Sequence, residues 1–396
     1  MAALGVFVFV FALLASIAIH ELGHLLTAKK FGMKASRYFI GMGPTLWSTR
    51  RGETEYGFKA LPIGGFVKIV GMTQLEDLDD PRDEPRAFWR QPAPQRAVVL
   101  AAGSFMHFVI ALFVLYAALV AFGEPTTETT RVRFVSECLE PDVKTECAGK
   151  PDAPAKAAGV QEGDRVVAFG GEEVTDWKSL TQLIRAQPAG RTELVVLRDG
   201  VRVPLEVSVV RRQIEQPDGT FVEGGQIGLY PGENKDHSVV SAMPRTGSFL
   251  WELTTGSVAG LAKLPGQIPE LFKDQVEGNE RRASEGAPVG VVDLGRISAD
   301  AFVDGDFLAV MFMIAGLNVF VGLFNLLPLL PLDGGHLAIL GFEQARTRVY
   351  KLIGRRDPGR VDLRKLMPAM VAFIVVMGSV ALMLVYAGIA NPISLQ

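Results

Sequence analysis

Residues 15–31 read ASIAIHELGHLLTAKKF and close an apolar run that begins at Ala2. The run is long enough to cross a bilayer as a helix, because about 20 residues suffice. His20, Glu21 and His24 nevertheless lie inside it. An ionisable side chain in a bilayer costs free energy, so such residues usually mark function. The stretch predicts a membrane helix that carries a chemical site.

The 396-residue chain contains four apolar stretches of this kind. They run approximately over Ala2–Thr27, Ala97–Phe122, Phe307–Leu330 and Leu366–Ala390. A cleaved signal peptide is the alternative for the first, but no basic region precedes it and its apolar run is too long. The net charge of −3 gives no reason to expect nucleic acid as a partner. We predict a polytopic α-helical membrane protein with four transmembrane helices, in contact with membrane lipid.

Basic residues predict the orientation, because Lys and Arg are enriched in cytoplasmic loops. They follow the first span, precede the second and crowd between the third and fourth. Both termini are then extracytoplasmic. The chain divides into a membrane half (1–122), an extracytoplasmic region (123–300) and a second membrane half (301–396). Cys138 and Cys147 could form a disulfide in that region, although two free thiols fit the sequence nearly as well.

HELGH at 20–24 matches the H-E-x-x-H pattern of zinc-dependent proteases. Residues four apart share one face of a helix, so His20 and His24 can reach the same metal ion. Glu21 lies close enough to take a proton from a water molecule that zinc activates. The short pattern also occurs by chance, but idle charges in an apolar span would be costly. The motif predicts a zinc site with Glu21 as general base.

A catalytic zinc needs a third protein ligand. Thr27 and Lys30 stand where the metzincin pattern requires Gly and His, so that class is excluded. The other candidates in or near apolar sequence are Asp333, His336 and His107. Asp333 follows the third span at its expected cytoplasmic end, at a depth similar to HELGH. We favour Asp333 as the ligand over a solvated loop carboxylate, and we expect His336 to support it and His107 to pack within its helix.

The pairing of HELGH with NLLPLLPLDGGH at 325–336 resembles the site-2 proteases, zinc enzymes that cut substrates within the membrane. The similarity continues through GMGPTLWS at 41–48 and YGFKALPIGGFVKIVGM at 56–72. It is similar to the bacterial RseP type, and the single PDZ-like module is typical of its actinobacterial branch. The resemblance implies an intramembrane endopeptidase of the bacterial cytoplasmic membrane with its active site toward the cytoplasm. Its substrates would be single-pass membrane proteins such as anti-sigma factors or remnant signal peptides.

The resemblance also assigns roles to individual residues. AGSFMHF at 102–108 departs from the family's AGPxxNF, since Ser104 replaces a proline and His107 an asparagine. That leaves the packing of the second span and the role of His107 open. By motif match, zinc is bound by His20, His24 and Asp333, Glu21 is the base, and Asn325 positions the substrate or the developing oxyanion.

A membrane re-entrant β-hairpin is predicted at about residues 54–71. Tyr56–Ala60 and Phe66–Val70 are strand-like, and the turn-forming PIGG separates them. A substrate helix must unfold locally before cleavage, and an exposed strand edge can pair with its extended backbone. A cytoplasmic hairpin that only packs is the alternative. Together with the resemblance, the pattern predicts that the substrate is contacted by Gly65, Phe66, Val67, Lys68 and Ile69.

The extracytoplasmic region is predicted to hold an inserted PDZ-like α+β domain at about residues 127–212. We expect a helix from about Asp176 to Gln187 and a hairpin at Asp199–Gly200, where Asp-Gly is a strong turn signal. PDZ folds bind extended peptides, whereas the resemblance implies a filter that screens substrates by size. Ser241–Val276 has amphipathic helical character and would lie on the outer membrane surface or pack in a second small domain.

Three functions stay open at this point. The first is an intramembrane zinc endopeptidase of regulated intramembrane proteolysis. The second is a catalytically inactive membrane scaffold that recruits partners through its PDZ-like module, and the third is a membrane-anchored quality-control zinc protease. The sequence favours the first, because all three expected ligands and the base are present and the ligands lie on spans.

Overall fold

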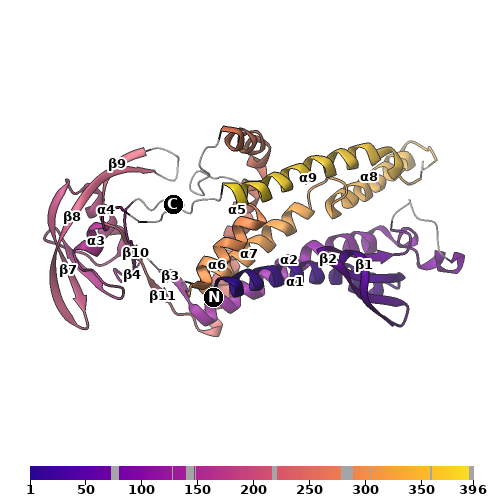
Figure 1. Ribbon diagram of the computed structural model, residues 1–396. Coiled ribbons are helices and arrows are strands. Elements are labelled where there is room, and N and C mark those ends of the chain that lie inside the picture. The colour runs from indigo at the N-terminus through magenta and orange to yellow at the C-terminus, as the bar shows by residue number, and fades with distance from the viewer. Residues whose placement is uncertain are drawn as a thin grey trace. The chain divides into compact units, whose positions relative to one another are not determined.

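The computed structural model describes residues 1–72, 80–126, 128–139, 147, 149–215, 221–277, 289–303, 305–356 and 359–391. The chain divides into two compact units (Figure 1). The helical unit comprises residues 1–118 and 242–396, and the sheet unit comprises residues 119–241.

In the described part of the chain, four helices are long and apolar enough to cross a membrane. They are α1 (Ala2–Lys30), α2 (Ala93–Phe122), α7 (Phe307–Asn325) and α9 (Met367–Ala390). The four-span prediction is confirmed, and the protein is a membrane protein. Their apolar character lies all around each helix, as expected where lipid rather than water covers the outer face.

The third span is shorter than predicted. It ends at Asn325 instead of Leu330, and Asp333 opens a separate helix, α8 (Asp333–Leu352). Pro328 and Pro331 lie between the two helices, where they cannot donate the backbone hydrogen bonds of a continuing helix.

Glycines allow α8 to begin very close to this turn. A Cβ on Gly334 would lie 2.1 Å from the carbonyl oxygen of Leu326, and one on Gly335 would lie 2.6 Å from the carbonyl carbon of Leu329. The two glycines therefore permit the close packing that positions Asp333 at the start of α8.

The predicted hairpin is built differently. β1 (Ala35–Arg51) and β2 (Thr54–Ile69) are two long bent strands joined by a turn at Gly52. Phe39 pairs with Phe66 on one side and with Gly57 on the other. Residues 37–40 therefore lie between the two halves of β2. Residues 65–69 do not pair with residues 56–60 as predicted, because PIGG bends β2 without reversing the direction of the chain.

This bending leaves residues 65–69 at an edge of the sheet, since 35–40 are their only strand neighbours in the described part of the chain. The sheet lies beside the C-terminal half of α1 (Figure 1). The segment between β2 and α2 contributes two short 3₁₀ helices, η1 (Pro81–Arg86) and η2 (Phe88–Arg90). The buried apolar core that joins sheet and helices consists of Leu25, Ala28, Met33, Ala35, Ile69, Phe88, Val99, Leu100 and Leu340.

Two further helices complete the helical unit. α5 (Val239–Glu277) confirms the predicted helical segment, and it packs on α2 and α7. The rings of Phe249 and Phe312 meet there with centroids 5.1 Å apart. α6 (Val291–Val303) packs on α1, where the hydroxyl of Ser298 donates to the carbonyl oxygen of Gly5 at 3.0 Å. The last turn before α9 is the 3₁₀ helix η3 (Leu363–Leu366).

The sheet unit is a curled antiparallel sheet with one longer helix. Its main sheet has the order β6-β5-β7-β8-β9. Asp176 caps α4 by accepting from the backbone N–H of Ser179 at 2.9 Å, and Asp199 forms the β7–β8 turn, so the predicted helix and hairpin are confirmed. Cys138 and Cys147 form a disulfide. The elements are β3 (Glu124–Thr126), β4 (Val132–Val135), α3 (Pro154–Ala157), β5 (Arg165–Phe169), β6 (Glu172–Glu173), α4 (Trp177–Ala186), β7 (Gly190–Arg198), β8 (Val201–Glu215), β9 (Phe221–Gln226), β10 (Leu229–Pro231) and β11 (Glu233–Lys235).

Candidate active site

Three side chains from the two ends of the chain meet at one point in the helical unit. His20 and His24 lie one turn apart on α1, and Asp333 is the first residue of α8. The two Nε2 atoms are 3.3 Å apart, and each is 3.4 Å from Oδ2 of Asp333. In the described part of the chain, these three form the one group whose potential ligand atoms converge in this way.

These separations fit a metal ion. A tetrahedral zinc ion with bonds of about 2.0–2.1 Å spaces its ligand atoms about 3.3–3.4 Å apart. Oδ2 of Asp333 is buried without a regular hydrogen-bond partner among the described residues. A buried carboxylate oxygen left unpaired is costly, and a cation between the three atoms would remove that cost. The two imidazoles and the carboxylate are also ligand types that zinc prefers.

His24 is oriented for this role by the second span. Its Nδ1 lies 2.7 Å from the carbonyl oxygen of Val99, so Nδ1 carries the proton and Nε2 presents its lone pair to the cluster. A hydrogen bond of this type on the second ring nitrogen is the usual support of a metal-binding histidine.

Glu21 lies beside the edge segment of the sheet. Its carboxylate accepts a backbone hydrogen bond from Val67. A Cβ on Gly65 would come within 3.2 Å of Cγ of Glu21 and Cγ2 of Ile17, so this strand touches α1 closely. Tyr38 ties the neighbouring strand to the same helix by donating to the carbonyl oxygen of Ala18 at 2.7 Å. Glu21 and the strand edge are therefore neighbours.

The second span closes the cluster on another side. Gly103 lies against both histidines, and Ser104 behind it has a fully buried hydroxyl without a partner in the described structure. His107 is 3% exposed, and its Nδ1 is 2.9 Å from Oδ1 of Asn318 on α7. The sequence did not single out Gly103 or Asn318 as part of this site. The departure of AGSFMHF from the family motif was the available signal for the side of the cluster that α2 covers.

The other predicted residues lie near the cluster without joining it. Asn325 is the last residue of α7, and its side chain makes no hydrogen bond to the three ligands within the described structure. His336 lies one turn after Asp333 on α8 and faces a separate cavity instead. The alternative third ligands His107 and His336 do not converge with His20 and His24, whereas Asp333 does.

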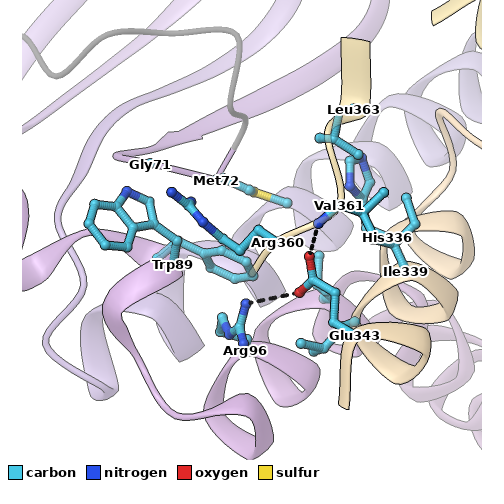
Figure 2. A pocket seen from close by; sticks show the side chains of 13 residues that line it. Gly71, Met72, Trp89, Arg96, His336, Ile339, Glu343, Arg360, Val361 and Leu363 are labelled. Atoms are coloured by element: carbon cyan, nitrogen blue, oxygen red, sulfur yellow. Dashed lines mark hydrogen bonds and ion pairs between the residues drawn. The ribbon is translucent and has the colours of Figure 1, made fainter. Parts of the chain in front are cut away.

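That cavity has a volume of about 50 Å³ and a lining of mixed polar and apolar residues. Figure 2 shows Glu343 of α8 between two partners: its Oε1 accepts from the backbone N–H of Val361 at 2.8 Å, and its Oε2 lies 3.8 Å from Nη1 of Arg96. Glu343 thus ties the segment before α9 to α8 and α2. The labelled lining residues are Gly71, Met72, Trp89, Arg96, His336, Ile339, Glu343, Arg360, Val361 and Leu363.

With this geometry established, comparison with known proteins identifies the family. The sequence profile of peptidase family M50 matches residues 8–355. The chain belongs to peptidase family M50. This M50 chain is 36% identical over 407 residues to the zinc metalloprotease Rip1 of Mycobacterium tuberculosis (strain H37Rv) and of Mycobacterium bovis (strain BCG), covering 99% of this chain and 98% of the relative. It is 35% identical over 405 residues to the Rip1 of Mycolicibacterium smegmatis, with the same coverage.

Membership of M50 confirms the predicted resemblance to site-2 proteases and the predicted enzyme class. The protein is a zinc metalloprotease, and the cluster of His20, His24 and Asp333 is consistent with its metal site.

Proposed function

We propose that this M50 protein is an intramembrane endopeptidase that cleaves single-pass membrane proteins within their membrane segment. The observation that carries the proposal is the convergence of His20, His24 and Asp333 at 3.3–3.4 Å, at the end of a helix that is apolar enough to span a bilayer. A protease built to act on soluble chains would not need its metal ligands on such helices, because each buried polar group there costs free energy.

The three residues would hold zinc, and Glu21 would move protons. A bound zinc ion supplies Lewis acidity and makes water nucleophilic at neutral pH. The Glu21 carboxylate would take the proton that the attacking water loses and deliver it to the nitrogen of the leaving amine. Its hydrogen bond from Val67 holds the carboxylate toward the strand edge, where the scissile bond would lie.

The edge segment 65–69 would bind the substrate as an added strand. A helix inside the membrane satisfies its own backbone hydrogen bonds, so unwinding it exposes N–H and C=O groups that need partners. An open strand edge provides them. The contact between Gly65 and Glu21 supports this arrangement, because a strand added here would pass next to the base.

Asn325 would act at the other side of the bound strand, since its amide N–H groups are suited to a developing oxyanion. Its position as the last residue of α7, eight residues before Asp333, supports this proposal.

We also propose that the sheet unit lies outside the cytoplasm of a bacterium. The disulfide Cys138–Cys147 supports this, because structural disulfides persist in oxidising compartments. The basic residues that flank the spans favour the same orientation. The sheet unit would act there as a PDZ-like domain that selects substrates, and anti-sigma factors or remnant signal peptides are the expected substrate types.

Reconstitution with a substrate tests the proposal. Purified wild type, Glu21→Gln and Asp333→Ala would be placed in liposomes with a single-pass membrane reporter and with the same reporter lacking its membrane segment. We expect the wild type to bind about one zinc per chain and to cleave the first reporter but not the second. Glu21→Gln should bind zinc without cleaving either reporter, and Asp333→Ala should lose both zinc and cleavage. Cleavage of both reporters would instead favour quality-control proteolysis, and cleavage by Glu21→Gln would remove the base from the mechanism.

A further inference from the structure

The two histidines of HELGH are held in different ways. The Nδ1 of His24 has the carbonyl oxygen of Val99 as its partner at 2.7 Å. The Nδ1 of His20 is buried and has no hydrogen-bond partner of regular geometry among the described residues, although the backbone of Gly103 interacts with the ring. Metal-binding histidines usually rely on such a bond to fix the ring, so something else must orient His20.

The surroundings of His20 provide packing in place of that bond. A Cβ on Gly103 would lie 2.6 Å from Cε1 of His20, so the α2 backbone presses directly on the ring. The ring of His107, one helical turn further along α2, lies with its centroid 5.0 Å from that of His20, at an interplanar angle of 41°. The torsion that rotates an imidazole is otherwise soft, and these two contacts restrict it.

His107 is itself fixed. Nδ2 of Asn318 donates to the carbonyl oxygen of Ile314 at 2.8 Å, which leaves Oδ1 of Asn318 as the acceptor for Nδ1–H of His107 at 2.9 Å. His107 and Asn318 are 3% and 2% exposed. A buried and fully paired hydrogen bond of this kind rigidifies its neighbourhood. A series of contacts thus links the third span α7, through Asn318 and His107, to the candidate metal ligand His20.

We propose that His107 is a positioning residue that holds the His20 imidazole for zinc by ring packing, with Asn318 as its anchor. This inference rests on the proposed role of His20 as a zinc ligand. It assigns a function to the histidine that interrupts the expected motif of the second span. The energetic argument is preorganisation: a ligand already held in place loses less conformational freedom when the metal binds.

Zinc affinity, measured by competition with a chelator on the full-length detergent-solubilised protein, tests the proposal. His107→Ala removes the ring and is expected to weaken zinc binding about 10–100-fold. The double variant His107→Phe/Asn318→Leu restores a ring and removes both polar partners together, which is close to neutral when shapes match. Because the ring that packs on His20 is kept, the zinc affinity of this double variant is expected to stay within about threefold of the wild-type affinity. Phe105→Ala, on the exposed side of the same helix, is the matched control.

The outcomes separate the inference from the proposed function. Wild type that binds no zinc would contradict the proposed function itself. Wild-type affinity in His107→Ala would overturn the positioning role alone. Equal weakening in His107→Ala and in the double variant would also overturn it, because a ring nitrogen would then be needed rather than packing. Thermal unfolding of the zinc-free proteins, run in parallel, identifies folded variants. The proposal requires His107→Ala to lose zinc affinity at a temperature at which its zinc-free form is still folded.

Discussion

Gly103 and His24 lie so close together that a methyl group would not fit between them. A Cβ at position 103 would lie 2.3 Å from Nε2 of His24 and 2.7 Å from Nε2 of His20. These nitrogen atoms are the ones that converge with Asp333. The second span therefore shapes the metal cluster through the absence of a side chain.

Gly103→Ala is expected to abolish zinc binding or weaken it at least 10-fold, because the new methyl group must displace the ligand nitrogens or the helix. Gly378→Ala in α9 is the control, since a Cβ there meets nothing within 4 Å. Both changes put alanine for glycine inside an apolar helix, so their intrinsic effects on helix propensity match. Zinc content and cleavage rate measure the difference. Equal zinc content in the two variants would contradict the tight fit at Gly103.

Gly65→Ala is expected to separate zinc binding from catalysis. Its Cβ would press on Cγ of Glu21 at 3.2 Å, while the metal ligands are not touched. A displaced base lowers the cleavage rate, by roughly 10-fold to 100-fold for a shift approaching 1 Å, and zinc content should stay at the wild-type level. Single-turnover cleavage together with metal analysis checks this. A loss of zinc in this variant would show that the strand supports the ligands rather than the base.

Glu343→Ala is expected to destabilise the part of the helical unit where α2, α8 and the segment before α9 meet. It would leave the side chain of Arg96, which is 13% exposed, without its ion partner, and the N–H of Val361 without its acceptor. Breaking a buried pair on one side costs roughly 3 kcal/mol. The double variant Arg96→Met/Glu343→Leu should recover most of the loss, since no unpaired charge remains. Denaturant unfolding in detergent would measure both. A double variant no better than Glu343→Ala would mean that the Val361 bond, and not the ion pair, dominates.

The sheet unit should lose a defined contribution to its stability in acid. Burial raises the pKa of Asp164, but the hydrogen bonds from Arg198 and from the backbone of Gln161 outweigh burial and hold that pKa below its usual value. The carboxylate therefore stabilises the fold fully above the unfolded-state pKa of about 3.9, and this stabilisation is lost as the pH falls through the lower folded-state pKa.

Asp164→Asn should accordingly be less stable than wild type at neutral pH, with the gap closing in acid. Hydrogen exchange of the peptide around β5 in the full-length protein measures the local opening free energy of each variant. A gap that stays constant as the pH is lowered below the usual Asp range would mean that shape rather than charge accounts for the effect of Asp164, because the contribution of the carboxylate is lost as it becomes protonated.

Local patterns made the membrane spans and the candidate metal cluster predictable. His20 and His24 share a helix face by spacing alone, and the apolar runs are long enough to read without tertiary information. Asp333 could be singled out because there were only three further candidates and Asp333 directly follows the third apolar run, whereas its convergence with His20 and His24 is seen only in the structure.

The remaining features depend on contacts between distant segments. PIGG contains turn residues, which predicted a hairpin between residues 56–60 and 66–70. Phe66 instead pairs with Phe39 of β1, a strand that lies earlier in the sequence. The early end of α7 follows from nearby prolines, whose effect on a helix is local. The close packing of Gly334 against the backbone of Leu326 is seen only in the three-dimensional structure. Likewise, no spacing rule links Gly103 and Asn318 to the metal cluster, since both act on it from other helices.

The donor atoms of the candidate site come from residues 20, 24 and 333. During synthesis the first two are in the membrane long before the third has left the ribosome, so every nascent chain shorter than 333 residues lacks a complete set of ligands. A membrane protease is dangerous to its own host while it is being made and folded. Here the order of the segments along the chain delays the assembly of a metal site until translation has passed residue 333.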